Sequence, residues 1–281
     1  MKRLLIGVLA ILLVLGVAAC GGSKKKSSGG GSKSSSSGKP PLAHPGKLTV
    51  GLNPPAVGFQ VGTLRGNNVI NPRGFEIDLA KDIAKKLGVS ASKIKWLNVP
   101  FATLFRPGPK PFDFAFEEAT ITPQRSQAVD FSSPYFDANQ GVLLKNGATT
   151  PHSLADLKNM SICAQTATTG LDYVQHKLHA TKIQQYNNTS AAFSAVQVGR
   201  CDAFVMDVPI VASQKKTKPS AYGPVAGQIV TKEQYGAVLP KDSKLTPFVS
   251  KAIDQLKSDG TIGKLQKQWF NIDVSKVPVL K

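Results

Sequence analysis

The chain has 281 residues, with 35 Lys and Arg against 17 Asp and Glu, and a formal net charge of +18 at pH 7. Such a basic chain could bind nucleic acid, but its lysines are scattered and no basic stripe interleaved with aromatic residues occurs. Residues 47–281 carry +11 of this charge and are long enough for one large or two modest domains.

The first 19 residues have the pattern of a secretory signal peptide. Lys2 and Arg3 precede an apolar run over 4–19, which is shorter than the about 20 residues that span a bilayer comfortably. The run ends in VAAC and resembles the lipobox of bacterial lipoproteins. This resemblance implies that Cys20 is lipidated and anchors the protein to the outer side of the cell membrane, where nucleic acid is not an expected partner. A plain transmembrane anchor is the alternative.

Residues 20–46 are rich in Gly, Ser and Lys and contain almost nothing to bury. This composition predicts a disordered tether between the lipid anchor and the folded part of the chain.

Strands and helices alternate in the next part of the chain. Apolar periodicity predicts a helix over 75–87, ended by Gly88, and a short helical turn after 101 that Pro107 cuts short. Strands are expected over 47–52, 93–99, 112–118 and 141–145. The order β-α-β-α-β favours a parallel sheet with covered faces.

A second unit with the same order follows. Its expected strands are 161–165, 182–186 and 201–207, separated by helices over 168–178 and 189–199. A strand over 235–240 and two closing helices complete the chain. Two similar α/β lobes predict a ligand site in the crevice at the carboxyl ends of their strands.

Seven segments, in this order, resemble the extracellular solute-binding proteins of ABC transporters, in the polar amino-acid branch (bacterial family 3). They are GFEIDLAKDIAKKLG, ITPQRSQAVDFSSPYF, SLADLKN, TATTGLDYV, AFSAVQVGRCDAFVMD, YGAVLP and LKSDGTIGKLQKQWF, and their order extends over most of 47–270. The resemblance implies an α/β, two-lobed periplasmic-binding-protein-like (type II) fold, in which each lobe is a mainly parallel sheet flanked by helices.

The resemblance also implies a division of the chain and a function. Lobe 1 would comprise 47–142 and 235–281, lobe 2 would comprise 146–232, and the hinge strands would be 141–145 and 235–240. Such a protein is expected to be a monomer without cofactor or metal. It binds a free amino acid between its lobes and presents it to a membrane permease.

Particular positions match the family's ligand contacts. Arg125 matches the arginine that clamps the α-carboxylate, for which the planar guanidinium is suited, and Asp207 matches the acid that receives the α-ammonium. The other matches are a hydroxyl at Thr120, backbone donors at Thr168 and Thr169 at a helix start, and ligand-packing rings at Phe101 and Phe59. The alternatives are a surface salt bridge for Arg125, a turn role for Asp207, a simple helix cap for Thr168, and core packing for the two rings.

Two adjacent acids depart from the family's pattern, and Ala56 stands where an aromatic residue is common. Strand alternation points Glu117 and Glu118 to opposite faces. Glu118 is expected in the cleft because it shares its parity with Phe114 and Phe116, although a bend would reverse the choice. An unpaired buried carboxylate is costly, so the ligand is expected to be arginine, lysine, histidine or glutamine, with Asn53 assisting at the rim.

Two other functions are compatible with parts of the sequence. A cyclohexadienyl dehydratase would share this fold and could use Glu118 as a general acid, but no nucleophile–base pair accompanies it. A metal site could use His176 and His179, which share a helix face, but two ligands alone make a poor site.

The two cysteines after Cys20 are Cys163 and Cys201. An oxidising compartment favours a disulfide between them. The strand order of such lobes, however, puts Cys163 near the ligand end of one strand and Cys201 at the far end of its neighbour. This stagger would exceed the about 7 Å between Cα atoms that a disulfide tolerates, so a bridge is disfavoured.

Overall fold

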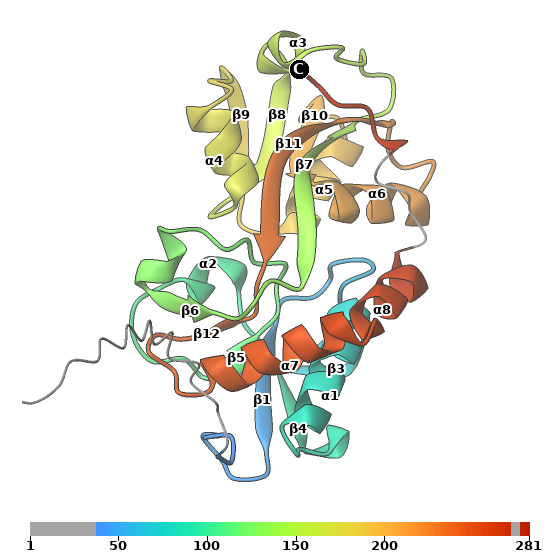
Figure 1. The fold of residues 1–281 in the computed structure, drawn as a ribbon. Coiled ribbons are helices and arrows are strands. Elements are labelled where there is room, and N and C mark those ends of the chain that lie inside the picture. Colours follow the sequence, from blue (N-terminus) through green and yellow to red (C-terminus); the bar gives the residue numbers. More distant parts are fainter. Residues whose placement is uncertain (1–37, 271–275) are drawn as a thin grey trace, which may run out of the picture. The chain divides into compact units, whose positions relative to one another are not determined.

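The computed structural model describes residues 38–270 and 276–281, so the expected signal peptide, Cys20 and most of the tether lie outside the described residues. The described residues form two lobes, each built on one sheet (Figure 1). Within these ranges, no helix combines the length and the apolar character that crossing a membrane requires.

The sheet of lobe 1 has seven strands in the order β2-β3-β4-β1-β5-β12-β6. Its strands are β1 (Leu48–Leu52), β2 (Val61–Arg65), β3 (Asn68–Arg73), β4 (Ile94–Asn98), β5 (Phe114–Ala115), β6 (Val129–Phe131) and β12 (Val238–Pro240). Its helices are α1 (Phe75–Lys86), α2 (Phe101–Leu104), α7 (Thr246–Ser258) and α8 (Thr261–Trp269), with 3-10 turns η1 (Ala91–Lys93) and η2 (Arg125–Gln127). The parallel pairs are β1 with β4 and β1 with β5, and the remaining pairs are antiparallel, so this sheet is mixed and not mainly parallel as expected.

The sheet of lobe 2 has five strands in the order β11-β7-β10-β8-β9. Its strands are β7 (Phe136–Leu144), β8 (Ser161–Gln165), β9 (Lys182–Tyr186), β10 (Ala203–Asp207) and β11 (Val225–Tyr235). Its helices are α3 (Leu154–Lys158), α4 (Thr169–His176), α5 (Thr189–Gln197) and α6 (Val208–Thr217). Strands β8, β9 and β10 run parallel, as expected from the β-α-β-α-β order, whereas β7 is antiparallel to β10 and β11.

Local sequence explains where the key helices begin. Gly74 precedes α1 with a φ of 137°, and a Cβ there would lie 2.1 Å from the carbonyl oxygen of Phe59, so only glycine fits. Helix α4 begins behind Thr168, whose side chain accepts a hydrogen bond from the Leu171 N–H. Both helices therefore start at fixed points beside the region between the lobes.

The segments that connect the lobes differ from the expected hinge strands. Figure 1 shows β7 and β11 side by side in the sheet of lobe 2, where they pair from Val225 with Leu143 to Tyr235 with Phe136. The chain thus changes sheets over 132–135 and 236–237, and residues 136–142 belong to the sheet of lobe 2. The run over 141–144 is buried because β7 lies between β10 and β11. An apolar run of this kind is expected both in a central strand and in a strand that crosses between lobes, so the sequence does not distinguish the two.

Both ends of the described chain also differ from expectation. Leu42 packs against the core of lobe 1 and the Ala43 N–H donates to Asp113, so the last part of the expected tether is ordered. Near the carboxyl end, Val279 bridges to Gln228 and Leu280 is buried in the core of lobe 2, although this segment was expected in lobe 1.

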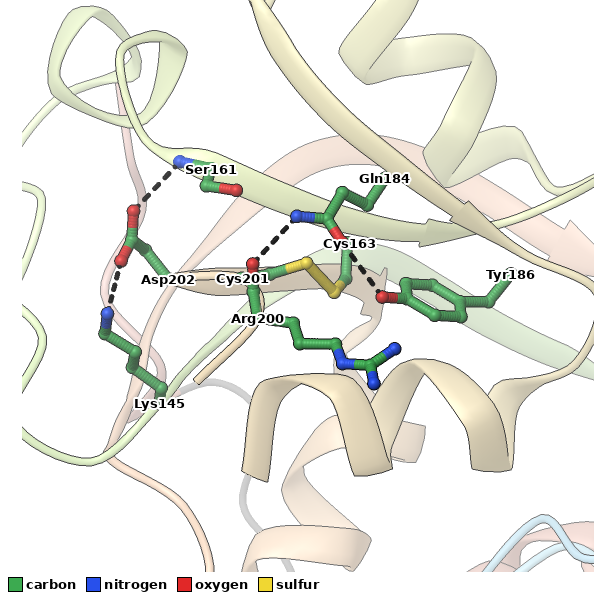
Figure 2. Close-up of a disulfide and its surroundings, with 8 residues drawn as sticks. All are labelled: Lys145, Ser161, Cys163, Gln184, Tyr186, Arg200, Cys201 and Asp202. Atoms are coloured by element: carbon green, nitrogen blue, oxygen red, sulfur yellow. Dashed lines mark hydrogen bonds and ion pairs between the residues drawn. A yellow bond between two sulfur atoms is a disulfide. The ribbon is translucent and has the colours of Figure 1, made fainter. Parts of the chain in front are cut away.

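Cys163 and Cys201 form a disulfide, with their Cα atoms 5.6 Å apart (Figure 2). The expectation against a bridge was wrong because Cys201 lies in the connection before β10, which begins at Ala203, and is not bound by the stagger of a strand. Hydrogen bonds hold this connection in place, from Gln184 to the Arg200 carbonyl (2.8 Å) and from the Ser161 N–H to Asp202 (3.0 Å).

We predict that this disulfide stabilises lobe 2 substantially. It joins residues 38 positions apart, and closing a loop of that size in the unfolded chain is worth about 3–4 kcal/mol. Replacing both cysteines by alanine should lower Tm in thermal unfolding followed by circular dichroism, and adding reductant should lower only the Tm of the unsubstituted protein. An unchanged Tm in the double variant would contradict this prediction.

Candidate functional site

A small pocket between the lobes contains most of the residues singled out from the sequence. Eight of the nine ligand-site candidates line it, namely Asn53, Phe101, Glu118, Thr120, Arg125, Thr168, Thr169 and Asp207. The ninth, Phe59, is fully buried in an aromatic cluster with Phe75, Phe136, Tyr235 and Phe270. Phe59 therefore belongs to the core, and we exclude it from the site.

Arg125 is the buried cation of this pocket, and it contacts both lobes. Its Nη1 donates to the Thr120 carbonyl (2.7 Å) in lobe 1, and its Nη2 donates to the Ala167 carbonyl (2.9 Å) in lobe 2. The guanidinium carbon lies 5.4 Å from the ring centre of Phe101 and 4.1 Å from that of Phe105. Burial lowers the Arg125 pKa to about 10, against the opposing effect of Asp207 and Glu233, so the side chain stays charged at neutral pH.

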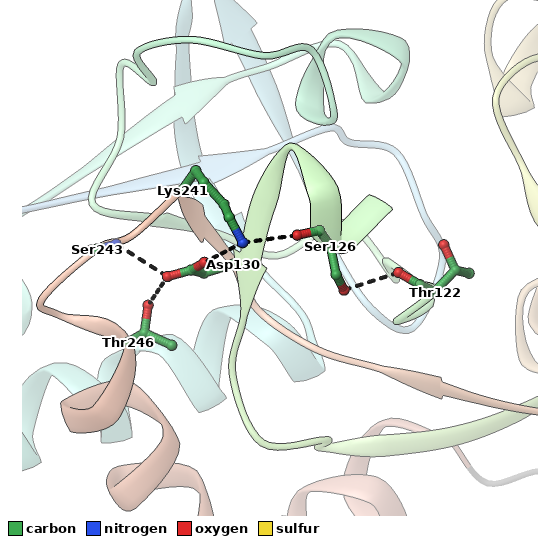
Figure 3. Close-up of polar contacts among 6 residues, drawn as sticks. All are labelled: Thr122, Ser126, Asp130, Lys241, Ser243 and Thr246. Carbon is green, nitrogen blue, oxygen red and sulfur yellow. Dashed lines mark hydrogen bonds and ion pairs between the residues drawn. The ribbon is translucent and has the colours of Figure 1, made fainter. Parts of the chain in front are cut away.

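A polar network fixes the turn that carries Arg125 (Figure 3). The Arg125 N–H donates to the Thr122 hydroxyl, and the Ser126 hydroxyl donates to the Thr122 carbonyl. Lys241, which follows β12, donates to the Ser126 carbonyl (3.0 Å) and pairs with Asp130 (3.5 Å). Asp130 also accepts hydrogen bonds from Ser243 and Thr246. These contacts attach the turn to β12 and to the start of α7.

Asp207 is the acid at the carboxyl end of β10. It is buried and accepts hydrogen bonds from Gln140 and from the Tyr235 hydroxyl. Burial and the charge of Glu233 raise its pKa to about 7, although these hydrogen bonds and Arg125 act in the opposite direction.

Helix α4 begins at the wall of the pocket. Thr168 is its cap, because its hydroxyl accepts from the Leu171 N–H and donates to the Gln165 carbonyl. The first N–H groups of a helix have no intrahelical partner and favour an anion. The Thr169 hydroxyl instead donates to Glu233 (2.7 Å), as does the Thr120 hydroxyl from lobe 1 (2.7 Å). Glu233 on β11, like Gln140, was missed in the sequence because nothing in its local pattern marks it.

Both adjacent acids line the pocket, but Glu117 is the one without a partner. It is 2 % exposed, and neither of its carboxyl oxygens has a hydrogen-bond partner. Glu118, which we expected to face the cleft, accepts a hydrogen bond from Gln60 (3.0 Å). Strict alternation fails here because β5 ends at Ala115 and Glu118 has a φ of 49°. Burial raises the pKa of Glu117 well above its usual range, and the charge of Glu76 adds to this effect.

Glu76, on helix α1, is a third acid beside Glu117 and Glu118. It accepts hydrogen bonds from Tyr135, from Gln60 (2.9 Å) and from the Glu118 N–H (3.0 Å). Burial raises its pKa and that of Glu118, with each carboxyl also affecting the other. Across residues 38–270 and 276–281, no ion pair involves Glu76, Glu117 or Glu118. The sequence did not indicate Glu76, which reads as a surface acid of an amphipathic helix.

The pocket holds about 20 Å³ of free space, which is roughly the room that one water molecule needs. An open groove of about 970 Å³ adjoins it and shares Arg125, Thr168 and Thr169 with it. A ligand larger than water can therefore enter only if the lobes move apart or side chains swing aside.

The histidine pair shows no metal-binding geometry. His176 bonds Asp172 (2.9 Å), and His179 lies beyond the end of α4. In the described part of the chain, no three His, Cys, Asp or Glu residues are grouped so that they could hold a metal ion.

Comparison with known proteins identifies the family. The model of the bacterial extracellular solute-binding proteins, family 3, matches residues 48–272. The chain belongs to this family. It is 32% identical to the ABC transporter arginine-binding protein 1 of Escherichia coli K12 over 70% of this chain and 81% of that protein. It is 29% identical to the L-cystine-binding protein TcyJ of the same strain, over 72% and 76%. The solved structure of an ancestral arginine-binding protein bound to arginine shares 33% identity and a TM-score of 0.69, over 80% of this chain and 99% of that one.

The pocket of this solute-binding protein carries more negative than positive groups. Arg125 and Asp207 present one charge of each sign, as a zwitterion requires, and Glu117 and Glu118 are additional acids. Burying a charge without a partner costs several kcal/mol, so Glu117 is held neutral unless a cation approaches it.

We predict that stability falls as pH rises, because folding keeps protons on the buried glutamates. Their pKa values are raised in the folded protein. The stabilisation that protonation gives is therefore complete below about pH 4, where an unfolded glutamate is also protonated, and it is lost as pH rises through the raised pKa values. The window of this loss lies between the unfolded and the folded pKa of each glutamate. Each group lowers the free energy of unfolding by about 1.4 kcal/mol per pH unit within that window. Denaturant unfolding between pH 5 and pH 8 measures this slope.

Glu117→Gln should remove one such group and reduce the slope, whereas Asp137→Asn, a substitution of an exposed acid on β7, should retain it. An equal slope in all three proteins would contradict the protonation of Glu117.

Proposed function

We propose that this protein captures a free amino acid with a cationic or amide side chain between its lobes and delivers it to the permease of an ABC transporter. The observation that carries the proposal is the unpaired, buried carboxyl of Glu117 beside Arg125 and Asp207. The relatives named for arginine and cystine support an amino-acid ligand.

In this proposal, each charged group of the ligand has its own partner. The α-carboxylate binds Arg125, whose two-pronged guanidinium fits two oxygens, and the N–H groups at the start of α4. The α-ammonium binds Asp207, and the side chain extends toward Glu117, Phe101 and Asn53. A guanidinium or ammonium at that end would ionise Glu117 and become desolvated with it, whereas an amide would donate a hydrogen bond to it.

Capture works by closure of the lobes. Thr120 and Arg125 lie in lobe 1, and Thr169 and Asp207 lie in lobe 2, so a ligand that touches all four binds the closed form more tightly than the open form. Such a difference in affinity is what shifts the population toward closure.

The site has no assigned catalytic role in this proposal. A raised pKa at Glu118 is compatible with a general acid, but its carboxyl is engaged with Gln60 and with the neighbouring Glu76. The named relatives are binding proteins, which favours a ligand that is released unchanged.

The proposal includes a membrane anchor. The signal-like residues 1–19 and the lipobox-like VAAC support lipidation of Cys20, outside the described residues. A lipidated Cys20 and the residues that follow it would hold the binding lobes near the permease as a tethered monomer.

We predict that L-arginine binds the unsubstituted protein and that Glu117→Gln weakens this binding about tenfold to a hundredfold. The reason is the loss of one buried, charge-assisted contact, which is worth about 1.5–3 kcal/mol. Isothermal titration calorimetry with arginine, glutamine and glutamate measures the effect on protein lacking residues 1–37.

Glu118→Gln is the matched control and should change arginine affinity by less than a factor of about three, because Glu118 already has partners. Arg125→Ala should abolish binding of every amino acid. Tightest binding of glutamate, or equal effects of the two Glu→Gln substitutions, would contradict the assignment of Glu117.

A further inference from the structure

A bulge in β11 brings the Glu233 carboxyl to the hydroxyls of Thr120 and Thr169, which line the pocket between the lobes. The pairing of β11 with β7 shifts between Ile229 and Glu233, which lie opposite Gln140 and Ala138. Residues 230–232 therefore stand opposite Asn139 alone, and Lys232 has a φ of 53°. The Asn139 side chain fixes the bulge, because its oxygen accepts from the N–H groups of Thr231 (3.1 Å) and Lys232 (3.0 Å). Bulges of this kind change the direction in which a following side chain points.

The Glu233 carboxylate determines whether the hydroxyls of Thr120 and Thr169 can donate or accept further hydrogen bonds. Thr120 and Thr169 both donate to its Oε2, each at 2.7 Å. A hydroxyl has a single proton, so one that donates to Glu233 has only lone pairs left for other groups. Apart from the hydrogen bond that the Thr169 hydroxyl accepts from the Gln140 amide (3.3 Å), the two hydroxyls can only accept from a group in the cleft, which suits an ammonium and not a carboxylate.

Glu233 also adds negative charge close to Asp207. The Gln140 amide nitrogen donates to both carboxyls, at 2.9 Å in the case of Glu233. The charged or titratable groups that affect Asp207 are Glu233 and Tyr235 from β11 and Arg125 from η2. Two acids and two hydroxyl acceptors therefore surround one small part of the cleft.

We infer that Glu233 is the positioning residue of an amine subsite, which makes the protein select acids that carry an α-ammonium group over the same acids without one. This inference rests on the proposed amino-acid ligand. It assigns Thr120 and Thr169 to the amine through their hydroxyls and leaves the carboxylate to Arg125 and to backbone N–H groups.

The test compares L-arginine with 5-guanidinopentanoate, the same acid without its α-amino group, by calorimetry on the folded part of the chain. A thermal-shift screen of the twenty amino acids comes first. If none of them binds, the proposed function itself fails, independently of Glu233. If another amino acid binds more tightly, that amino acid and its deaminated form replace the arginine pair.

Glu233→Gln should weaken binding of the amino acid about tenfold and change binding of the deaminated acid less than about twofold, so that the selectivity ratio shrinks. Asp137→Asn removes an exposed acid from the neighbouring β7 and should leave the ratio unchanged. Glu233→Gln should also shift the pH dependence of amino-acid binding toward lower pH, because a neighbouring charge no longer opposes the ionisation of Asp207. A role in folding alone would produce neither effect.

Thr169→Val and Thr169→Ser provide a second comparison that holds even if Glu233→Gln unfolds. The valine variant should lose selectivity for the amine and the serine variant should keep it. Equal weakening of both ligands by Glu233→Gln, no change, or tighter binding of the amino acid would overturn the inference. If Glu233→Gln does not fold, equal selectivity of the valine and serine variants would overturn it.

Discussion

The central constraint on this molecule is the burial of acidic groups without an equal number of cations. Glu76, Glu117 and Asp207 are buried between or beside the lobes, and Arg125 is the only buried Lys or Arg among the described residues. Water cannot solvate these acids, so their carboxyls are held protonated or hydrogen-bonded. In the proposed function, the ligand supplies the positively charged group that these acids lack among the described residues.

The two-lobed architecture fixes the positions of these acids and of Arg125 without forming an ion pair between them. Asp207 is fixed at the end of β10 by Gln140 and Tyr235, which come from the two strands β7 and β11 at the boundary with lobe 1. Arg125 is fixed on the other side by a turn that is anchored to β12 and α7. Because the opposing charges are held by different lobes, any ligand that neutralises both also holds the lobes together.

Much of this could be predicted from the sequence, for identifiable reasons. Arg125, Asp207 and Thr169 occur in motifs that resemble the family's, and the strand–helix order placed them at one edge of each sheet. Glu117 was misjudged because alternation holds only within a strand, and β5 is two residues long. Cys201 was misjudged for a similar reason, since it lies just outside its strand. Glu76 and Glu233 could not be found from local pattern, because their roles depend on a tertiary contact and on a bulge.

The most direct test of this account is the number of protons released when L-arginine binds. Titration calorimetry at pH 7 in buffers of different ionisation enthalpy measures that number. If the guanidinium of the ligand ionises Glu117, the unsubstituted protein releases about one proton more than Glu117→Gln. Ionisation of Asp207, whose pKa is about 7, contributes equally to both proteins and cancels in the difference. Equal proton release by the two proteins would show that Glu117 does not meet the ligand's charge and would contradict the central claim.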